Sequence, residues 1–244
     1  QLAAWWGTRW CPHPARIADL GSGIGSVALM AAWKCPGARL HTIEAQAASV
    51  DLARRSIRYN GLEARCTAHH GDLREALLTA AEALLTASGS SGADRGAAPA
   101  SFSLRDVARQ AGVSHAAPYH HFANRDELLA AVAARAFEQL GATMQASASA
   151  QAEPREQLLA IAEAYVHFAR VSPARFRLMF GPLLATRAQH PALDQAAAAS
   201  FAVLLGAAER LDARLALPLA LTGWSLAHGL SHLLLDEAFA GLKV

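Results

Sequence analysis

The chain has 244 residues, of which 53% are hydrophobic and 17% charged, and its formal net charge is +2. This composition is typical of a globular chain with a packed core and excludes a disordered one. A net charge of +2 is too small to indicate a polyanionic partner by itself. Alanine and leucine are the commonest residues, which favours helix.

The sequence favours a reducing, cytoplasmic setting. Cys11, Cys35 and Cys66 are too far apart for a metal site of the Cys-x-x-Cys kind, and buried thiols are the simpler interpretation. The chain opens on Gln1 without a basic segment or a cleavage pattern, so we expect no signal peptide. The uncharged segment 215–235 is long enough to cross a bilayer, but its histidines and hydroxyls favour a helix buried between subunits.

Residues 16–72 alternate short apolar runs with amphipathic helical segments. Strands are expected over 15–22, 38–45 and 64–72, and helices over 26–34 and 48–62. Strand–helix alternation at this spacing predicts a parallel sheet of about three strands, a partial Rossmann-like α/β segment.

From Leu73 onward we expect only helices, over 73–89, 104–112, 115–122, 125–141, 153–171, 173–185, 191–213 and 215–235. Residues 90–101 are a Gly/Ala/Ser-rich loop, and Ser114 and Asn124 are candidate N-caps. The predicted fold is therefore mainly α behind a partial α/β segment. We expect three domains: 1–72, 73–140 and 141–244.

A glycine-rich turn and two later carboxylates indicate a nucleotide-like ligand in the first domain. Glycines between a strand and a helix let the backbone approach a ligand, and the helix N-terminus presents free N–H groups. Carboxylates at the ends of the next two strands can accept ribose hydroxyls and an adenine amine. The candidate cofactor residues are Asp19, Gly21, Gly23, Gly25, Glu44 and Asp72.

These residues resemble class I S-adenosylmethionine-dependent methyltransferases over about the first seventy residues. The resemblance implies that Asp19 and the glycines form the first signature, that Glu44 is the ribose carboxylate and that Asp72 is the adenine-side acid. The family's catalytic tetrapeptide and its later strands are absent from this sequence, which has no Pro-Pro pair. We therefore expect no catalytic residues and favour a cofactor-binding half-domain whose first strand has a bare edge.

The stretch 103–133, "SLRDVARQAGVSHAAPYHHFANRDELLAAVA", has the layout of a helix-turn-helix followed by a third helix. It resembles the DNA-binding domain of TetR-type transcriptional repressors, whose Tyr-x-His-Phe signature matches Tyr119, His121 and Phe122. Ser103, Tyr119 and Arg125 are expected at phosphates, with His115, Ala116 and His120 at base edges behind the cap Ser114. Residues 73–140 carry six basic and seven acidic side chains, so this domain has few cations for phosphates.

The C-terminal "WSLAHG" resembles the Trp-His-Gly motif of one TetR subgroup, and the likeness runs to the end of the chain. It implies a two-fold dimer through 194–211 and 215–235 and a cavity for an apolar effector. The expected pocket residues are Tyr165, Phe168, Phe176, Met179, Phe180, Trp224 and His228. His228 and His232 stand four apart, but no further ligand sits beside them, so we expect no metal site.

The sequence thus predicts a TetR-type regulator, most simply a repressor that a small apolar effector releases from operator DNA. No cofactor is required for that role, although S-adenosylmethionine remains possible at the first domain. The alternative is an S-adenosylmethionine-dependent methyltransferase acting on nucleic acid or protein. A third interpretation is a gene-fusion remnant whose first third has no selected activity.

Overall fold

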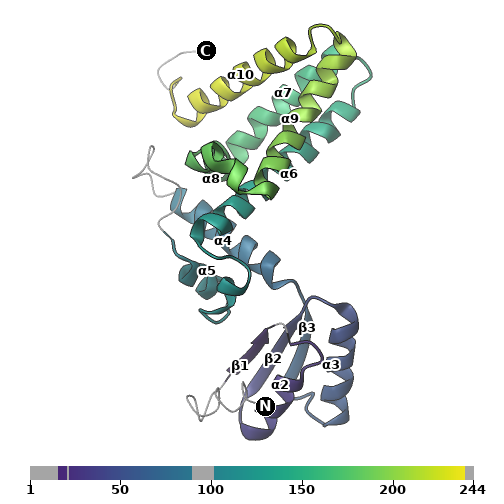
Figure 1. Ribbon diagram of the computed structural model, residues 1–244, viewed down its shortest axis with the longest axis vertical. Coiled ribbons are helices and arrows are strands. Elements are labelled where there is room, and N and C mark those ends of the chain that lie inside the picture. The colour runs from purple at the N-terminus through teal and green to yellow at the C-terminus, as the bar shows by residue number, and fades with distance from the viewer. Residues whose placement is uncertain (1–15, 21, 90–101, 240–244) are drawn as a thin grey trace. The chain divides into compact units, whose positions relative to one another are not determined.

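The computed structural model describes residues 16–20, 22–89 and 102–239. The chain divides into two compact units that interleave along the sequence: Gln1–Ala80 with Leu104–His121, and Ala81–Ser103 with Phe122–Val244. The elements in chain order are β1 (Arg16–Leu20), α2 (Ser26–Lys34), β2 (Arg39–Glu44), α3 (Ala47–Tyr59), β3 (Cys66–His70), α4 (Leu73–Gly89), α5 (Leu104–Gln110), η1 (Ala117–His120), α6 (Arg125–Ser149), α7 (Pro154–Val171), α8 (Pro173–Met179), η2 (Pro182–Gln189), α9 (Pro191–Leu211) and α10 (Ala216–Leu235) (Figure 1).

The first unit contains a parallel sheet of three strands in the order β1-β2-β3. Ile17 pairs with Leu40, and Leu40 pairs with Cys66. Parallel neighbours need a crossover, and α2 and α3 supply the two crossovers. Both helices share one core with the sheet, formed mainly by Ala28, Ala31, Ala32, Leu40, Val50, Ala53, Ile57, Cys66 and Ala68. The expected partial α/β segment with three strands ahead of a mainly α chain is therefore confirmed.

The turn after α5 also belongs to the first unit. Gly112 has a φ of +70°, a value that residues with a side chain rarely adopt, and the Val113 N–H donates to the Ala108 carbonyl at 2.9 Å. The next segment differs from the expected helix over 115–122, because η1 is a single 3-10 turn of four residues. Pro118 explains the difference, since it has no N–H and its ring disfavours a continuing α-helix. The N–H groups of Ala117, Tyr119 and His121 accordingly donate three residues back.

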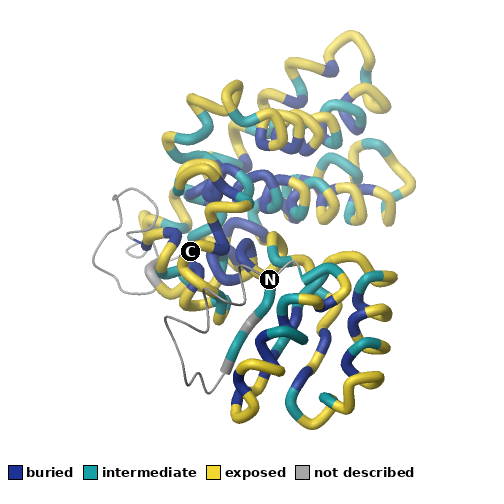
Figure 2. Tube along the Cα trace, turned by 60° about the horizontal axis from the view of Figure 1, so that its bottom comes forward, coloured by how far each residue is buried: buried dark blue, intermediate teal, exposed yellow. Residues whose placement is uncertain are grey.

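The second unit is a helical bundle built on α6, which packs against α9 and α7. Gly141 of α6 permits the close approach, because a Cβ there would lie 3.4 Å from the Ser200 Cα of α9. Burial is one-sided along these helices, with buried and exposed positions alternating around each turn (Figure 2). Such a stripe of buried residues is what holds amphipathic helices in a bundle.

One described helix, α9, is long and apolar enough to cross a membrane by length and composition, with a mean hydropathy of 1.3. It is not the segment 215–235 that the sequence singled out. Leu193, Leu204 and Ala207 of α9 are buried, and α9 packs on α6, α7 and α10. These contacts are those of a core helix in a bundle.

Candidate functional sites

The second unit contains a partly open cavity of about 380 Å³. Its wall comes from α6, α7, η2, α9 and α10, together with Phe180 between α8 and η2. Most of the lining is apolar or aromatic, which is typical of sites for small organic molecules. The lining residues are Phe137, Leu140, Met144, Tyr165, Phe180, Leu184, Arg187, Ala197, Ala198, Ser200, Phe201, Leu204, Leu221 and Trp224.

Three of the seven residues expected in an effector pocket line this cavity, namely Tyr165, Phe180 and Trp224. The other four lie outside its wall: Phe168, Phe176, Met179 and His228. Phe176 and Met179 are 0% and 1% exposed, so they belong to the packed core beside the cavity. An aromatic residue on a buried helix face fills core as readily as it lines a cavity, and the sequence alone does not separate the two.

Sequence reasoning missed the contribution of α6. Phe137, Leu140 and Met144 stand three and four residues apart, so they share one face of this helix, and all three line the cavity. That spacing was visible in the sequence, but α6 was interpreted only as the helix after the DNA-reading segment. Arg187 of η2 and Phe201 of α9 were missed as well.

The two residues of the Trp-His motif converge on one hydroxyl. Trp224 Nε1–H donates to the Tyr165 hydroxyl at 3.3 Å, and that hydroxyl lies 2.8 Å from His228 Nδ1. The His228 ring also stands against Phe180, with 4.5 Å between ring centroids, and against His232 at 4.6 Å. One polar cluster is thereby enclosed by aromatic rings at the edge of the cavity.

The ionisation of this cluster follows from its burial. Burial raises the pKa of the Tyr165 phenol, so the phenol keeps its proton. Burial, aided by the charge of His232, lowers the pKa of His228, which favours the neutral imidazole. The Tyr165 hydroxyl accepts from Trp224, and it donates to His228 Nδ1 in the tautomer whose proton is on Nε2.

Five of the expected DNA-contacting residues lie together around η1 in the first unit. Ala117 and Pro118 are buried and hold the turn in place. The exposed residues beside them are Ser114, His115, Ala116, Tyr119 and His120. Tyr119 is 54% exposed, so its hydroxyl is accessible to a phosphate.

The other two expected DNA contacts, Ser103 and Arg125, lie in the second unit. Ser103 is exposed, whereas Arg125 is half-buried and its Nε–H donates to the Phe102 carbonyl at 3.0 Å. Part of the Arg125 guanidinium is therefore used within the protein. Asn124 caps α6 as expected, because its side chain accepts from the Glu127 N–H at 2.9 Å.

The glycine-rich turn and Glu44 meet at the carboxyl ends of β1 and β2. Gly23 and Gly25 have φ values of +52° and +83°, and a Cβ on Gly23 would meet nothing within 4 Å. Glu44 accepts from the Gly23 N–H at 2.9 Å and from the Gln46 N–H at 3.0 Å. The hydrogen bond from Gln46, followed by that from Gly23, lowers the pKa of Glu44 and keeps it ionised.

The remaining candidate cofactor residues have local roles in the structure. Asp19 accepts from the Ala28 N–H at 3.2 Å in the first turn of α2, while burial raises its pKa. Asp72 accepts from the Arg74 N–H at 2.7 Å at the start of α4. Gly21 lies outside the described residues. In the same turn, the buried Ser22 hydroxyl has no hydrogen-bond partner among the described residues.

Three family models match the chain. Residues 94–132 match the model described as bacterial regulatory proteins, tetR family. Residues 158–244 match the Tetracyclin repressor-like C-terminal domain, and residues 10–86 match the methyltransferase small domain. The C-terminal match covers the cavity-lining residues of α7, η2, α9 and α10 but not those of α6, and the methyltransferase match covers the α/β segment and most of α4.

Two solved structures and one methyltransferase are among the proteins similar to parts of this chain. A structure of a protein with unknown function from Rhodococcus sp. RHA1 is 31% identical, with a TM-score of 0.58, over 72% of this chain and 89% of its own. The crystal structure of SCO4313, described as a candidate regulatory protein, is 25% identical, with a TM-score of 0.52, over 70% of this chain and 89% of its own. The ribosomal protein uL3 glutamine methyltransferase of Bradyrhizobium diazoefficiens is 34% identical over 64 residues, 25% of this chain. This chain spans 20% of the length of that methyltransferase.

Together, the helix–turn segment and the helical bundle define a transcriptional regulator of the helix-turn-helix class, with a ligand-binding C-terminal domain. Within that class the chain belongs to the TetR family, and a methyltransferase-like segment precedes its TetR domains.

Proposed function

We propose that this regulator is a repressor that holds operator DNA through the segment around η1 and that a small apolar molecule releases it. The observation that carries this proposal is the largely apolar, partly open cavity of about 380 Å³ in the domain that follows the DNA-binding segment. Ligand binding there would shift a population between a DNA-binding and a released state. The proposed organisation is a three-domain one with boundaries near residues 72 and 140, and a DNA-binding role implies a cytoplasmic location.

One helix joins the two proposed activities. α6 begins at Arg125, directly after the Tyr119–Phe122 signature, and carries Phe137, Leu140 and Met144 into the cavity wall. A ligand that pushes on these side chains acts on the same rigid element that follows the DNA-reading turn. This is a physical route for coupling that needs no contact between ligand and DNA.

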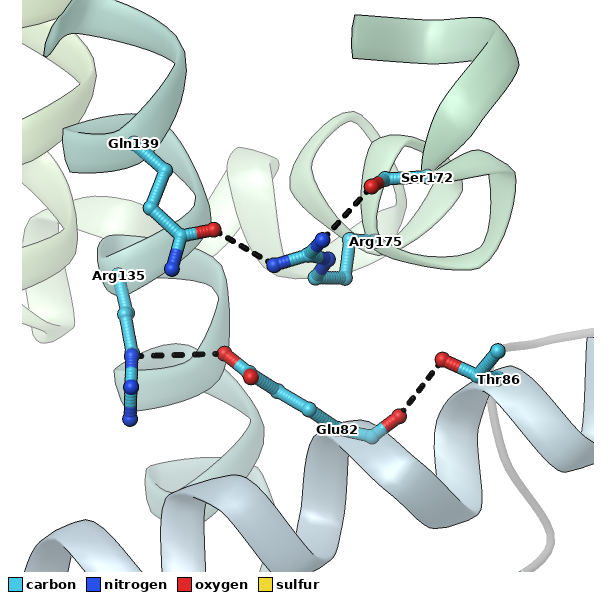
Figure 3. Close-up of polar contacts among 6 residues, drawn as sticks. All are labelled: Glu82, Thr86, Arg135, Gln139, Ser172 and Arg175. Atoms are coloured by element: carbon cyan, nitrogen blue, oxygen red, sulfur yellow. Dashed lines mark hydrogen bonds and ion pairs between the residues drawn. The ribbon is translucent and has the colours of Figure 1, made fainter.

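Polar contacts hold α6 to its neighbours on the other side. In Figure 3, Arg135 of α6 lies beside Glu82 of α4, with 3.6 Å between Nε and Oε1. One turn further along α6, Gln139 accepts from Arg175 of α8 at 2.6 Å, and Arg175 also donates to Ser172 at 2.7 Å. A shift of α6 would therefore be passed to α4 and α8 together.

We further propose that the chain works as a homodimer through the outer face of α10. Leu226, Leu230 and Leu233 on this face are 70%, 42% and 46% exposed. They form an apolar row whose exposure to water is unfavourable. Gly229, beside them on this face, has nothing within 4 Å of an added Cβ, so a second helix can approach closely. A two-fold dimer would also double the phosphate contacts of a DNA-binding domain that is itself not basic.

The test is titration of the purified chain against its own upstream DNA at several salt concentrations. Specific binding to a palindrome, weakening steeply with salt, is the expected result, and His115→Ala should relax sequence preference while leaving the fold unchanged. His167→Ala, which removes an exposed histidine of α7 outside the DNA-binding segment, is the matched control. Absence of specific binding at low salt would overturn the repressor proposal.

The second candidate function is binding of S-adenosylmethionine by the α/β segment, favoured by the positive φ values of Gly23 and Gly25 beside the ionised Glu44. The buried Ser22 hydroxyl in the same turn, which no other described residue hydrogen-bonds, is a further polar group that a ligand could satisfy. Glu44 would hold ribose hydroxyls and the glycine turn would lie along the ligand, which would supply an electrophilic methyl group. Methyl transfer to DNA, RNA or protein, compared with Asp19→Ala, tests the enzyme. A shift of operator affinity with S-adenosylmethionine and no methyl transfer would instead indicate a cofactor sensor.

A further inference from the structure

Among the described residues that line the cavity, Arg187 is the only charged one. It comes from η2, which also contributes Leu184, and its side chain is 49% exposed. A half-exposed cation on an otherwise apolar wall lies where the cavity meets solvent. The one charged side chain among the described lining residues is therefore reached from solvent, and the rest of the wall is mostly apolar or aromatic.

The Arg187 guanidinium uses only part of its hydrogen-bonding capacity in its ion pair with Asp194. Its Nε lies 2.9 Å from Asp194 Oδ1, and within the described part of the chain this is the one ion pair it makes. Arginine carries five N–H donors in a planar fork, so the Nη edge still presents two parallel donors. Asp194 is 51% exposed, and an exposed ion pair of this kind contributes little, so an incoming carboxylate can share or replace it.

The interior of the cavity sets the size and character of the apolar body that a bound carboxylate would carry. Phe137, Phe180, Phe201 and Trp224 surround the space with aromatic rings, and Leu204 and Leu221 complete the wall. One water molecule occupies about 30 Å³ of liquid. A cavity of about 380 Å³ therefore accepts roughly a dozen non-hydrogen atoms. The polar group at the inner edge, the Tyr165 hydroxyl, already bonds to Trp224 and His228.

We propose that the ligand of this cavity is an apolar monocarboxylate of about a dozen non-hydrogen atoms, a medium-chain fatty acid or an arylalkanoic acid, with its carboxylate on Arg187. The claim that this carboxylate acts as the effector rests on the proposed repressor function, whereas the claim that it binds in the cavity does not. Decanoate and 4-phenylbutyrate have this size and charge, and they differ in whether the body is an alkyl chain or a ring.

The test is titration calorimetry of the full chain with decanoate, 4-phenylbutyrate, 1-decanol and decylamine. The two carboxylates should bind at least tenfold more tightly than the alcohol, and the amine should bind most weakly. Arg187→Gln should lower the affinity for decanoate about tenfold, as expected for a half-exposed charge-assisted pair, and leave the affinity for decanol unchanged. Asp194→Asn removes the competing carboxylate and should tighten decanoate binding.

The matched control is Arg170→Gln, which removes an exposed arginine of α7 that does not line the cavity. Equal binding of decanol and decanoate, no binding of either, or an Arg187→Gln variant that behaves like the control would each overturn the proposal. If decanoate binds through Arg187 yet leaves operator DNA bound, the ligand class stands and the release step of the proposed function fails.

Discussion

Replacing Tyr165 by Phe removes one oxygen atom from the centre of the polar cluster beside the cavity. Tyr165 is 5% exposed, and its hydroxyl bonds to His228 Nδ1 at 2.8 Å and to Trp224 Nε1 at 3.3 Å. The ring stays in place, with Phe176 edge-on at 5.7 Å between centroids. The substitution therefore tests the two hydrogen bonds rather than the packing.

The expected loss of unfolding free energy is about 2 kcal/mol. The shorter bond, to a half-buried imidazole, contributes about 1.5 kcal/mol, and the longer one about 0.5 kcal/mol. The second figure is the smaller because Trp224 lines the cavity, where a water molecule can take over its N–H. With a urea slope of about 2 kcal/mol per molar, the midpoint should fall by about 1 M.

The assay is urea unfolding followed by far-UV circular dichroism at pH 7.5. Tyr119→Phe is the control, since Tyr119 is 54% exposed, and its stability should stay within about 0.5 kcal/mol of the parent. A double-mutant cycle with His228→Leu should return a coupling of about 1 kcal/mol or more. If Tyr165→Phe unfolds at the same urea concentration as Tyr119→Phe, the hydrogen-bonded cluster does not stabilise the fold.

Three further predictions concern acid stability, assembly and the α4–α6 contact. Burial lowers the pKa of His228 below its ordinary 6.5, so as the pH falls the His228 imidazole is protonated in the unfolded chain before it is protonated in the folded one. The free energy of unfolding should therefore fall as the pH drops below about 6.5. Urea midpoints measured from pH 7.5 to 5.5 should fall less steeply in His228→Leu than in the parent chain. Leu226→Glu on the outer face of α10 should convert a dimer into a monomer by light scattering with an unchanged circular dichroism spectrum, whereas Leu159→Glu, at a site 60% exposed on α7, should leave the mass unaltered. Glu82→Gln should lower the free energy of unfolding by about 1 kcal/mol, because the Glu82 and Arg135 side chains are only 17% and 29% exposed. Asp51→Asn, which breaks the more exposed Asp51–Arg54 pair, should lower it by less than about 0.5 kcal/mol. Equal losses in the two variants would contradict this ranking.

Much of the fold could be predicted because it depends on local patterns. The α2 and α4 helices begin and end where the sequence pattern placed them, at 26–34 and 73–89. The three strands could be predicted from short apolar runs, and the N-cap role of Asn124 from the capping preference of its side chain. Pro118 also acts locally, but its effect was overlooked, so a 3-10 turn stands where a longer helix was expected.

The site could be predicted only in part, because a cavity is a property of several helices at once. Tyr165, Phe180 and Trp224 were found through their aromatic character and the Trp-His-Gly motif. Phe176 has the same character but is fully buried, and no sequence pattern distinguishes a residue beside a cavity from one that lines it. Arg187 belongs to no motif, because its place in the cavity wall depends on how η2 packs against α6, α8 and α9.

What the sequence by itself determined about this protein is the kind and order of its parts: an α/β segment, a DNA-binding segment and a helical domain. The elements follow from periodicity, caps and glycine positions, which act over a few residues, and the DNA-binding character of the middle segment is what its resemblance to TetR-type repressors implies. Only the tertiary structure decided that Trp224 and His228 meet on the Tyr165 hydroxyl, 59 and 63 residues away in sequence, and that Glu44 closes on Gly23, 21 residues before it. Such contacts depend on how whole helices and strands pack, because burial and hydrogen-bond partners are fixed by the neighbours that packing brings together.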